Sequence, residues 1–239
     1  MKTSLLAVAA AALLGACSFT TGGPAFTGAA YCGTVTACDE GCARGDAHAC
    51  GYMSQAAMMG SGIPRSAERF LSYARKGCDG GDGRSCAQVA LAYFAAIGVA
   101  QDWQKAVEYN DKSCVLGFSV GCNSLGLAYR DGHGVAKDPA RASTLFAQSC
   151  DGGSALGCLS LAQESPDGMV PEDRAAKALP LLVHDCDPGA NPAIRVCTVA
   201  ARMYAAGRGA ARDDAQARSL YEAACHRGDP DACDLLRRR

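Results

Sequence analysis

Cysteine is the residue type whose number and spacing most strongly suggest chemistry in this chain. The 239 residues include 15 cysteines, and most of them follow a step of 36 residues. The first position of this step is occupied by Cys42, Cys78, Cys114, Cys150 and Cys186. A second cysteine follows eight residues later, or 11 residues later in the last case, at Cys50, Cys86, Cys122, Cys158 and Cys197. Cys225 and Cys233 close the series. Ordered cysteines can form disulfides or bind a metal ion, so both chemistries have to be considered.

Metal binding fits this pattern poorly. Zinc sites favour cysteine pairs two to four residues apart, and no such pair recurs. Cys38 and Cys42 lie four apart, but Cys42 already belongs to the 36-residue pattern. The histidines occupy different positions of the repeat, at His48, His133, His184 and His226. The sequence therefore predicts no metal site and no cofactor.

The elements that position the cysteines repeat with the same step. Small residues recur four positions after the second cysteine, at Ser54, Ala90, Gly126, Ala162 and Ala201. Apolar residues at spacings of three and four around them indicate one face of a helix. A glycine turn such as Gly132-His133-Gly134 follows, and Asp138-Pro139 has the residue types that begin a helix. Each unit is predicted to contain two helices joined by a glycine turn, without strands.

With this layout the chain resembles the Sel-1-like repeat family, which is related to tetratricopeptide repeats, and within it the cysteine-rich Hcp-type branch. The segment from Gly126 to Asp138 is similar to the family consensus. The resemblance implies an all-α fold, a right-handed α/α solenoid of helical hairpins, over residues 32–239. The expected units are 42–77, 78–113, 114–149, 150–185 and 186–224, with a terminal fragment at 225–239. The fourth unit departs from the pattern, because Ser165-Pro166-Asp167-Gly168 replaces a tyrosine turn and Pro180 falls inside a helix.

The same resemblance implies that the paired cysteines form disulfides that join the end of one helix to the first turn of the next. In the chain-entropy model a bridge over about nine residues stabilises the fold by about 2–3 kcal/mol. Such bridges matter in a solenoid, where each unit contacts only its neighbours. Cys32 and Cys38 remain outside the pattern. They are expected to pair with each other as an N-terminal cap, and a reactive thiol is the alternative.

The N-terminal residues predict export and a lipid anchor. An apolar run from Leu5 to Leu14 follows Lys2, and it is shorter than the roughly 20 residues that span a bilayer. These features are typical of a secretory signal peptide at residues 1–16. Leu14-Gly15-Ala16-Cys17 resembles the lipobox of bacterial lipoproteins, which implies lipidation of Cys17, followed by a flexible tether over 17–31. Ser18 replaces the Asp of inner-membrane retention signals, so we expect the outer membrane, facing the periplasm, where disulfides form.

The charge of the chain argues against nucleic-acid binding, and its lack of catalytic motifs argues against serine-enzyme chemistry. The chain has 23 basic and 24 acidic residues, and so lacks the strongly basic character typical of nucleic-acid binding. The Hcp-type resemblance implies, as an alternative function, weak binding or hydrolysis of penicillins or peptidoglycan fragments. Serine enzymes of that kind carry Ser-x-x-Lys, Ser-Asp-Asn and Lys-Thr-Gly, and none of the three occurs. We therefore predict a non-catalytic adaptor that binds an unidentified protein or peptide and contacts the membrane only through its lipid.

The expected binding surface is the concave face of the superhelix, which in tetratricopeptide-type proteins is lined by the first helix of each unit. Transferred to this chain, that face contains the polar residues His48, Gln55, Arg84, Asn123, Arg130, Gln163, Arg195 and Arg202. A solvated helix face is the alternative explanation for each of them. Guanidinium groups pair bidentately with carboxylates, so the four arginines favour an acidic or C-terminal carboxylate partner.

Overall fold

The structure is a computed structural model that describes residues 29–186 and 195–237. Every regular element in these ranges is a helix, which confirms the predicted all-α fold of helical hairpins. The chain divides into two compact units, Met1–Ala142 and Ser143–Arg239, and each is described by itself. The predicted signal peptide, Cys17 and most of the tether lie outside the described residues.

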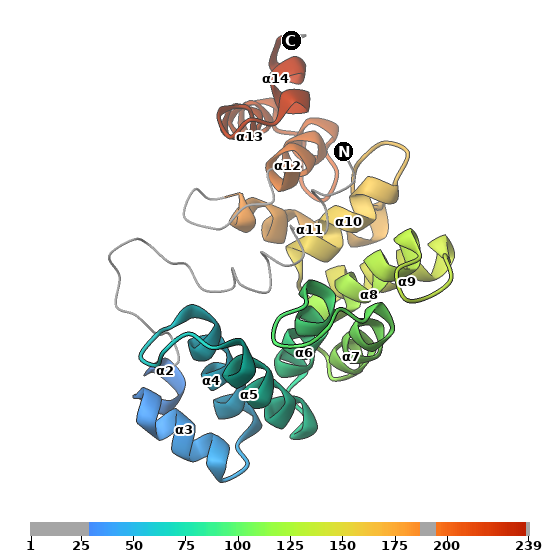
Figure 1. The fold of residues 1–239 in the computed structure, drawn as a ribbon. Helices are drawn as coiled ribbons and strands as arrows, with labels where there is room; N and C mark the ends of the chain where they lie inside the picture. Colours follow the sequence, from blue (N-terminus) through green and yellow to red (C-terminus); the bar gives the residue numbers. More distant parts are fainter. Residues whose placement is uncertain (1–28, 187–194, 238–239) are drawn as a thin grey trace. The chain divides into compact units, whose positions relative to one another are not determined.

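The helices follow one another in hairpins (Figure 1). The first unit contains α2 (Ala29–Cys32), α3 (Val35–Ala43), α4 (Ala47–Met59), α5 (Ala67–Asp79), α6 (Gly83–Ala95), α7 (Trp103–Val115) and α8 (Ser119–Asp131). Helix α9 (Pro139–Asp151) crosses the boundary between the units. The second unit continues with α10 (Ala155–Glu164), α11 (Glu172–Asp185), α12 (Arg195–Ala206), α13 (Asp214–His226) and α14 (Pro230–Arg237). None of these helices is long and apolar enough to cross a membrane.

Most helices begin directly after a capping side chain. The carboxylates of Asp46, Asp82 and Asp102 each accept a hydrogen bond from the amide three residues later, at 3.0–3.1 Å. Such a cap satisfies one of the backbone amides that the first helical turn leaves unpaired. The same cap recurs at Ser66, Asp138, Ser154 and Asp213. Sequence-encoded caps therefore set where these helices start.

The turn inside a hairpin also repeats. In four hairpins the amide of the capping residue donates to the carbonyl nine residues earlier, in the pairs Ser66–Ala57, Asp102–Tyr93, Asp138–Tyr129 and Asp213–Tyr204. Helix α8 ends at Gly132, whose φ of 77° is the left-handed conformation expected of a C-cap glycine. Ala96 adopts the same conformation with φ 56° at the end of α6. One turn geometry thus serves repeats with different side chains.

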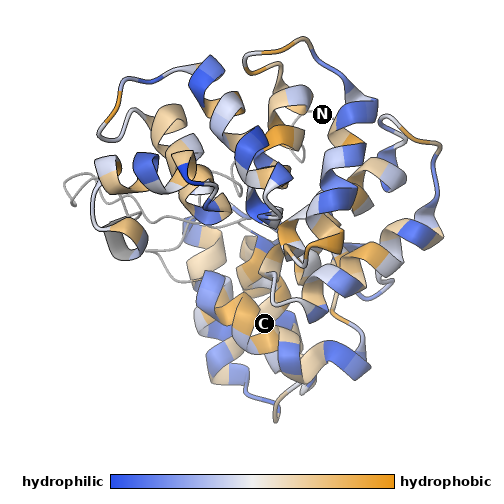
Figure 2. Cartoon of the chain, turned by 90° about the horizontal axis from the view of Figure 1, so that it is seen from below, coloured by the Kyte–Doolittle hydropathy of each residue, from blue (hydrophilic) through white to orange (hydrophobic). Residues whose placement is uncertain are grey.

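The predicted small positions lie where helices pack. Ser54, Ala90, Ala162 and Ala201 are all at most 1% exposed. The Ser54 hydroxyl donates to the carbonyl of Phe70, 2.9 Å away on the facing helix. In the first unit Phe70 joins a cluster of buried residues that includes Val89 and Tyr93. Most helices combine hydrophobic and hydrophilic residues, as Figure 2 shows.

Seven disulfides join cysteines within the described residues, which confirms the predicted disulfide-stapled solenoid. They are Cys32–Cys38, Cys42–Cys50, Cys78–Cys86, Cys114–Cys122, Cys150–Cys158, Cys186–Cys197 and Cys225–Cys233. In a typical bond, Cys78 lies in the last turn of α5 and Cys86 in the first turn of α6, with Cα atoms 4.5 Å apart. Each such bond therefore fixes a short loop between successive repeats.

The irregular hairpin of the second unit is held by an arginine. Helix α10 ends after ten residues, and α11 begins after Pro171 without a side-chain cap. Pro180 lies on the exposed side of α11, which continues through it. The guanidinium of Arg208, from the turn between α12 and α13, pairs with Asp167 at 2.7 Å and donates to the carbonyl of Val170. These contacts tie the altered turn to the following hairpin.

Candidate functional site

A hollow of about 600 Å³ opens in the first unit, where the loops between repeats meet the starts of helices. We name this hollow the basin. It is lined by Tyr31, His48, Gly51, Tyr52, Gly81, Asp82, Gly83, Arg84, Leu116, Gly117 and Phe118. The lining side chains come from α2 and α4, from the α5–α6 loop with the start of α6, and from the α7–α8 loop. Three successive repeats and the N-terminal cap therefore contribute to one site.

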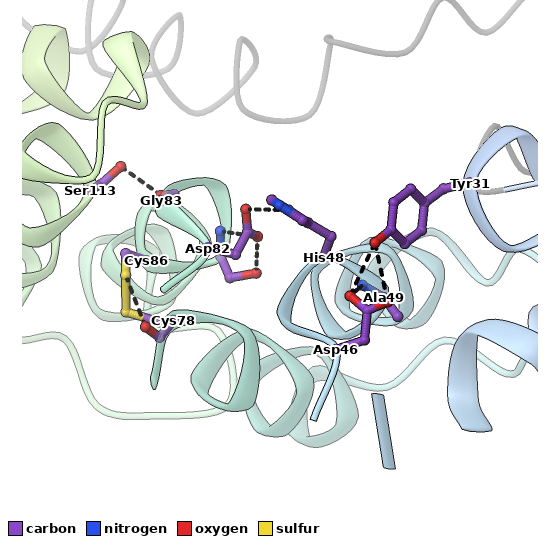
Figure 3. Close-up of polar contacts among 10 residues, drawn as sticks. Tyr31, Asp46, His48, Ala49, Cys78, Asp82, Gly83, Cys86 and Ser113 are labelled. Atoms are coloured by element: carbon purple, nitrogen blue, oxygen red, sulfur yellow. Dashed lines mark hydrogen bonds and ion pairs between the residues drawn. A yellow bond between two sulfur atoms is a disulfide. The ribbon is translucent and has the colours of Figure 1, made fainter. Parts of the chain in front are cut away.

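Aromatic rings from α2 and α4 form one part of the lining. The Tyr31 ring lies 5.3 Å from that of Tyr52 and meets the His48 ring edge-on at 6.0 Å, measured between centroids. The Tyr31 hydroxyl donates to the carboxylate of Asp46 at 3.1–3.2 Å (Figure 3). This hydrogen bond raises the pKa of Tyr31. Because the hydroxyl is engaged, the ring, with the residue 49% exposed, is what Tyr31 offers to a ligand.

Asp82 supplies the buried carboxylate of the basin, with only 6% of the residue exposed. Its Oδ2 accepts hydrogen bonds from both the amide and the hydroxyl of Ser85, and its Oδ1 lies 3.1 Å from Nδ1 of His48 (Figure 3). Gly51 leaves room for this arrangement, since a Cβ there would lie 2.7 Å from Oδ2. The His48–Asp82 pair thus joins the starts of α4 and α6.

The loop of residues 115–118 supplies an apolar part of the lining. Val115 is 78% exposed, and the next residue, Leu116, which lines the basin, is 45% exposed. Phe118 occupies the N-cap position of α8 but gives the helix no side-chain hydrogen bond. The Arg84 guanidinium lies 5.5 Å from the centroid of the Phe118 ring. The Ser113 hydroxyl donates to the carbonyl of Gly83 at 2.7 Å, which holds α7 against the start of α6 (Figure 3).

Two of the eight predicted groove residues, His48 and Arg84, line the basin. Gln55 and Arg130 belong to the same unit but lie outside its lining. The Arg130 guanidinium forms two hydrogen bonds of 3.0 Å with the carboxylate of the adjacent Asp131. Gln163, Arg195 and Arg202 lie in the second unit, where Arg195 is exposed and the other two are half-buried.

Asn123 requires a correction, because it was expected on an open concave face and is only 3% exposed. It directly follows the second cysteine of its repeat. The equivalent Ala87 is fully buried as well, so this position of the helix faces its packed neighbours rather than solvent. The error came from assigning Asn123 to the concave face by a transferred helix phase and by its polarity.

Tyr31, Tyr52, Leu116 and Phe118 were missed by the sequence argument, although one signal for them was present. Residues 115–118 are Val-Leu-Gly-Phe, whereas the equivalent residues 79–82 are Asp-Gly-Gly-Asp and 151–154 are Asp-Gly-Gly-Ser. Three apolar residues thus replace polar or glycine positions of an otherwise regular loop. Comparison of the loops, and not only of the helices, would have pointed to the α7–α8 loop.

The chemistry of the basin favours binding. No serine, lysine or free thiol is among its lining residues. In the part of the chain that the structure describes, no three His, Cys, Asp or Glu side chains gather as a metal site would require. What the lining does contain is aromatic surface, one buried carboxylate and one guanidinium.

The repeat itself is identified by comparison with known proteins. The profile of the Sel1 repeat matches residues 47–82, 84–117, 119–154 and 196–229, which together exceed half of the chain. The interval between the third and fourth matches contains the irregular hairpin of α10 and α11. No curated protein matches the chain.

Solved structures are similar to parts of this chain. A protective antigen of uropathogenic Escherichia coli with an SLR fold is 21% identical with a TM-score of 0.63, over 84% of this chain and 42% of that one. A Sel1 repeat protein from Oxalobacter formigenes is 22% identical with a TM-score of 0.67, over 85% of this chain and 58% of that one. Cysteine rich protein B of Helicobacter pylori is 25% identical with a TM-score of 0.43, over 52% of this chain and 89% of that one.

The present chain therefore spans about half the length of the first two of these structures. Their likeness concerns the arrangement of helical hairpins. Together with the four profile matches, it leads to one conclusion about ancestry. This chain belongs to the Sel1 repeat family.

Proposed function

We propose that this chain is a non-catalytic scaffold of the bacterial cell envelope that binds a peptide, or a segment of a partner protein, in the basin. Sel1 repeat proteins are generally scaffolds for protein interaction. The observation that carries the proposal is the basin itself, a hollow of about 600 Å³ lined by side chains from three repeats. A volume of this size falls in the range of known ligand pockets, roughly 300–1,000 Å³.

The composition of the basin supports a binding role. Tyrosine and arginine are among the residues that most often dominate the binding energy of protein interfaces, and phenylalanine is enriched there. Tyr31, Tyr52 and Phe118 provide rings, and Arg84 provides a guanidinium. The His48–Asp82 pair adds polar groups whose positions are fixed by hydrogen bonds within the fold.

Site-specific crosslinking in the native envelope tests where a partner binds. We expect the photoreactive residue p-benzoylphenylalanine at position 116 of the full chain to give a discrete adduct. The same residue at position 218, an exposed site of α13 in the second unit, is the control and should not give that adduct. Introducing Phe118→Ser beside the position-116 crosslinker should remove it. An adduct that forms equally from both positions, or that survives Phe118→Ser, would contradict binding in the basin.

Export is supported by the cysteines, and the anchor is part of the proposal. Seven disulfides indicate an oxidising compartment outside the cytoplasm. The lipobox-like Leu14-Gly15-Ala16-Cys17 supports lipidation of Cys17 and an outer-membrane location facing the periplasm. Membrane fractionation should find the chain in the outer-membrane fraction, and Cys17→Ala should move it to the soluble periplasmic fraction. Mass spectrometry of the N-terminal peptide should show acyl chains on Cys17, and an unmodified cysteine would refute the anchor.

The absence of catalysis can be tested with a chromogenic β-lactam. The oxidised chain should show no turnover above a buffer blank, because the basin lining contains neither Ser nor Lys. Turnover that persists through further purification and is lost in His48→Ala would instead favour β-lactam chemistry at the basin. Turnover that is unaffected by His48→Ala would indicate a contaminating enzyme.

A further inference from the structure

The α7–α8 loop differs from the equivalent loops in its capping position and in its exposed apolar residues. Phe118 stands where Asp82 and Ser154 cap the equivalent helices, and its side chain gives α8 no cap hydrogen bond. Val115 and Leu116 are two of the three large apolar residues that are exposed in the described part of the chain. A position that breaks the local rules of stability in an otherwise regular repeat is typical of a functional surface. Exposed apolar side chains that gather in one place mark interaction sites.

The third exposed large apolar residue, Tyr31, belongs to the same basin. Its ring packs against Tyr52, and its hydroxyl is held by Asp46. Two of these three exposed apolar residues, Tyr31 and Leu116, therefore line one hollow, and Val115 is next to Leu116 in the sequence. The basin consequently offers an apolar side chain of a ligand two sets of contacts, Tyr31 with Tyr52 and Leu116 with Phe118.

The charge of the basin gives a second element of specificity. Asp82 is the one carboxylate among the lining residues, and both of its oxygens already accept hydrogen bonds or contact His48. Arg84 forms no ion pair with any residue that the structure describes, and its guanidinium is placed by the ring of Phe118. The charge that remains available to a ligand is therefore positive. It lies directly beside the apolar contacts.

We infer that the basin recognises a segment of a partner protein that presents an aromatic or branched apolar side chain next to an aspartate or glutamate. The apolar side chain packs between the tyrosines and the α7–α8 loop, and the side-chain carboxylate pairs with Arg84. This inference rests on the proposed function and specifies the ligand of the same site. It commits to a side-chain carboxylate, and recognition of a chain terminus is one of the alternatives that the experiment separates.

A displayed peptide library provides the test. Random heptapeptides fused to the N-terminus of a phage coat protein carry no free α-carboxylate, so any enrichment of acid reports side chains. Selection against the oxidised full chain in detergent should enrich an aromatic or branched apolar residue adjacent to Asp or Glu. The best peptide, and an analogue with Gln or Asn in place of the acid, are then synthesised with blocked ends and titrated by fluorescence anisotropy.

Three variants separate the two elements of recognition. Arg84→Met keeps the aliphatic stem and should weaken binding of the acidic peptide about fivefold, as expected for a partly exposed ion pair. It should leave the neutral analogue unchanged. Phe118→Ser copies Ser154, provides a capping residue, and should weaken both peptides tenfold or more, as for a hot-spot aromatic. Arg65→Met, which removes an exposed arginine of the same unit outside the basin, should change neither.

The outcomes distinguish the inference from the proposed function. Enriched peptides that lose affinity in Phe118→Ser but show no acidic preference, or a basic one, would overturn the inference and leave basin binding intact. A free C-terminal carboxylate as the recognised group would appear as affinity only for peptides with an unblocked C-terminus, which also overturns it. If no peptide is enriched, or if enriched peptides bind Phe118→Ser as well as the native chain, both the inference and the proposed function fail.

Discussion

The loops that precede α6 and α8 share one backbone and serve different purposes. In both, a disulfide holds the flanking cysteines with Cα atoms 4.5 Å apart. Both contain a glycine with positive φ at the same position, Gly81 at 91° and Gly117 at 81°. The capping residue is extended in both, with φ −81° and ψ near 100°. The side chains differ, because Asp82 caps its helix and Phe118 does not.

This difference shows that a disulfide allows the side chain at the N-cap position to vary. Where a disulfide and a glycine already determine the path of a loop, the cap side chain is no longer needed to define it. The position can then carry a residue that serves recognition, as in other proteins where rigid frameworks present variable loops. The α5–α6 loop uses its side chains for stability, and the α7–α8 loop presents its side chains to solvent and to the basin.

Removing the staples is the most severe test of this comparison. The double variants Cys78→Ala with Cys86→Ala, and Cys114→Ala with Cys122→Ala, should each lower the free energy of unfolding by about 2–3 kcal/mol. We expect the loss at the α7–α8 loop to be at least as large, because no cap supports that loop once its bond is gone. Urea denaturation with the other disulfides kept oxidised measures both. A much smaller loss at Cys114–Cys122 would show that the loop is fixed by something other than its staple.

Loss of the cap at the α5–α6 loop should have the next largest effect. Asp82→Ala removes the partner of the Ser85 amide and hydroxyl and of His48. We expect the free energy of unfolding to fall by about 1–2 kcal/mol. Asp102→Ala is the matched control, since Asp102 caps α7 with a single amide hydrogen bond away from the basin, and it should lose less. Thermal denaturation measures the stability of both variants. Equal losses of stability would mean that the contacts of Asp82 with His48 and the Ser85 hydroxyl add nothing to the cap.

The sequence predicted the elements of this fold because they repeat. Most periods of 36 residues carry the same cysteines, small positions and turn glycines, so an error at one repeat is corrected by the others. The basin does not repeat. It brings together side chains from residues 31 to 118, and its exposed apolar members, Tyr31 and Leu116, lie in a cap and a loop, where no helical pattern identifies an exposed face.

Helix phase was the other limit of the sequence argument. Arg84 and Asn123 were assigned to one face by their position and polarity, and only Arg84 lines the basin. Which side of a helix is covered depends on the angle at which its neighbours pack, and that angle is set by contacts distant in sequence. The periodicity of one helix cannot report it.

A capping residue at position 118 should give the α7–α8 loop the stability that Asp82 gives the α5–α6 loop. Phe118→Ser places in α8 the residue that caps α10 as Ser154, and we expect it to raise the free energy of unfolding by about 0.5–1 kcal/mol. Phe118→Ala removes the ring without providing a cap and is the control. The melting temperature of Phe118→Ser should therefore exceed that of Phe118→Ala. If the two variants melt together below the native chain, the Phe118 ring stabilises the loop through packing, and its role is structural.

The smallest expected effect is a loss of stability at acidic pH. Asp46 is the cap of α4, and the Ala49 amide, opposed by burial and assisted by the Tyr31 hydroxyl, lowers its pKa below the ordinary value of 3.8. A lowered pKa in the folded state means that the charged cap contributes stability above pH 3.8, and that this contribution is lost as the pH falls through the folded value. The α7–α8 loop has no such carboxylate at its cap.

Amide NMR shifts can follow this difference within one molecule. The amide of Ala49 should titrate with a midpoint below pH 3.8, whereas the amide of Gly121, three residues after Phe118, should stay constant over the same range. Asp46→Asn should abolish the Ala49 transition and leave Gly121 as it was. If Gly121 titrates in step with Ala49 in the native chain, protonation of Asp46 in the α3–α4 loop is transmitted to the start of α8. The α7–α8 loop would then be coupled to the cap of α4, and its separate assignment to recognition would be wrong.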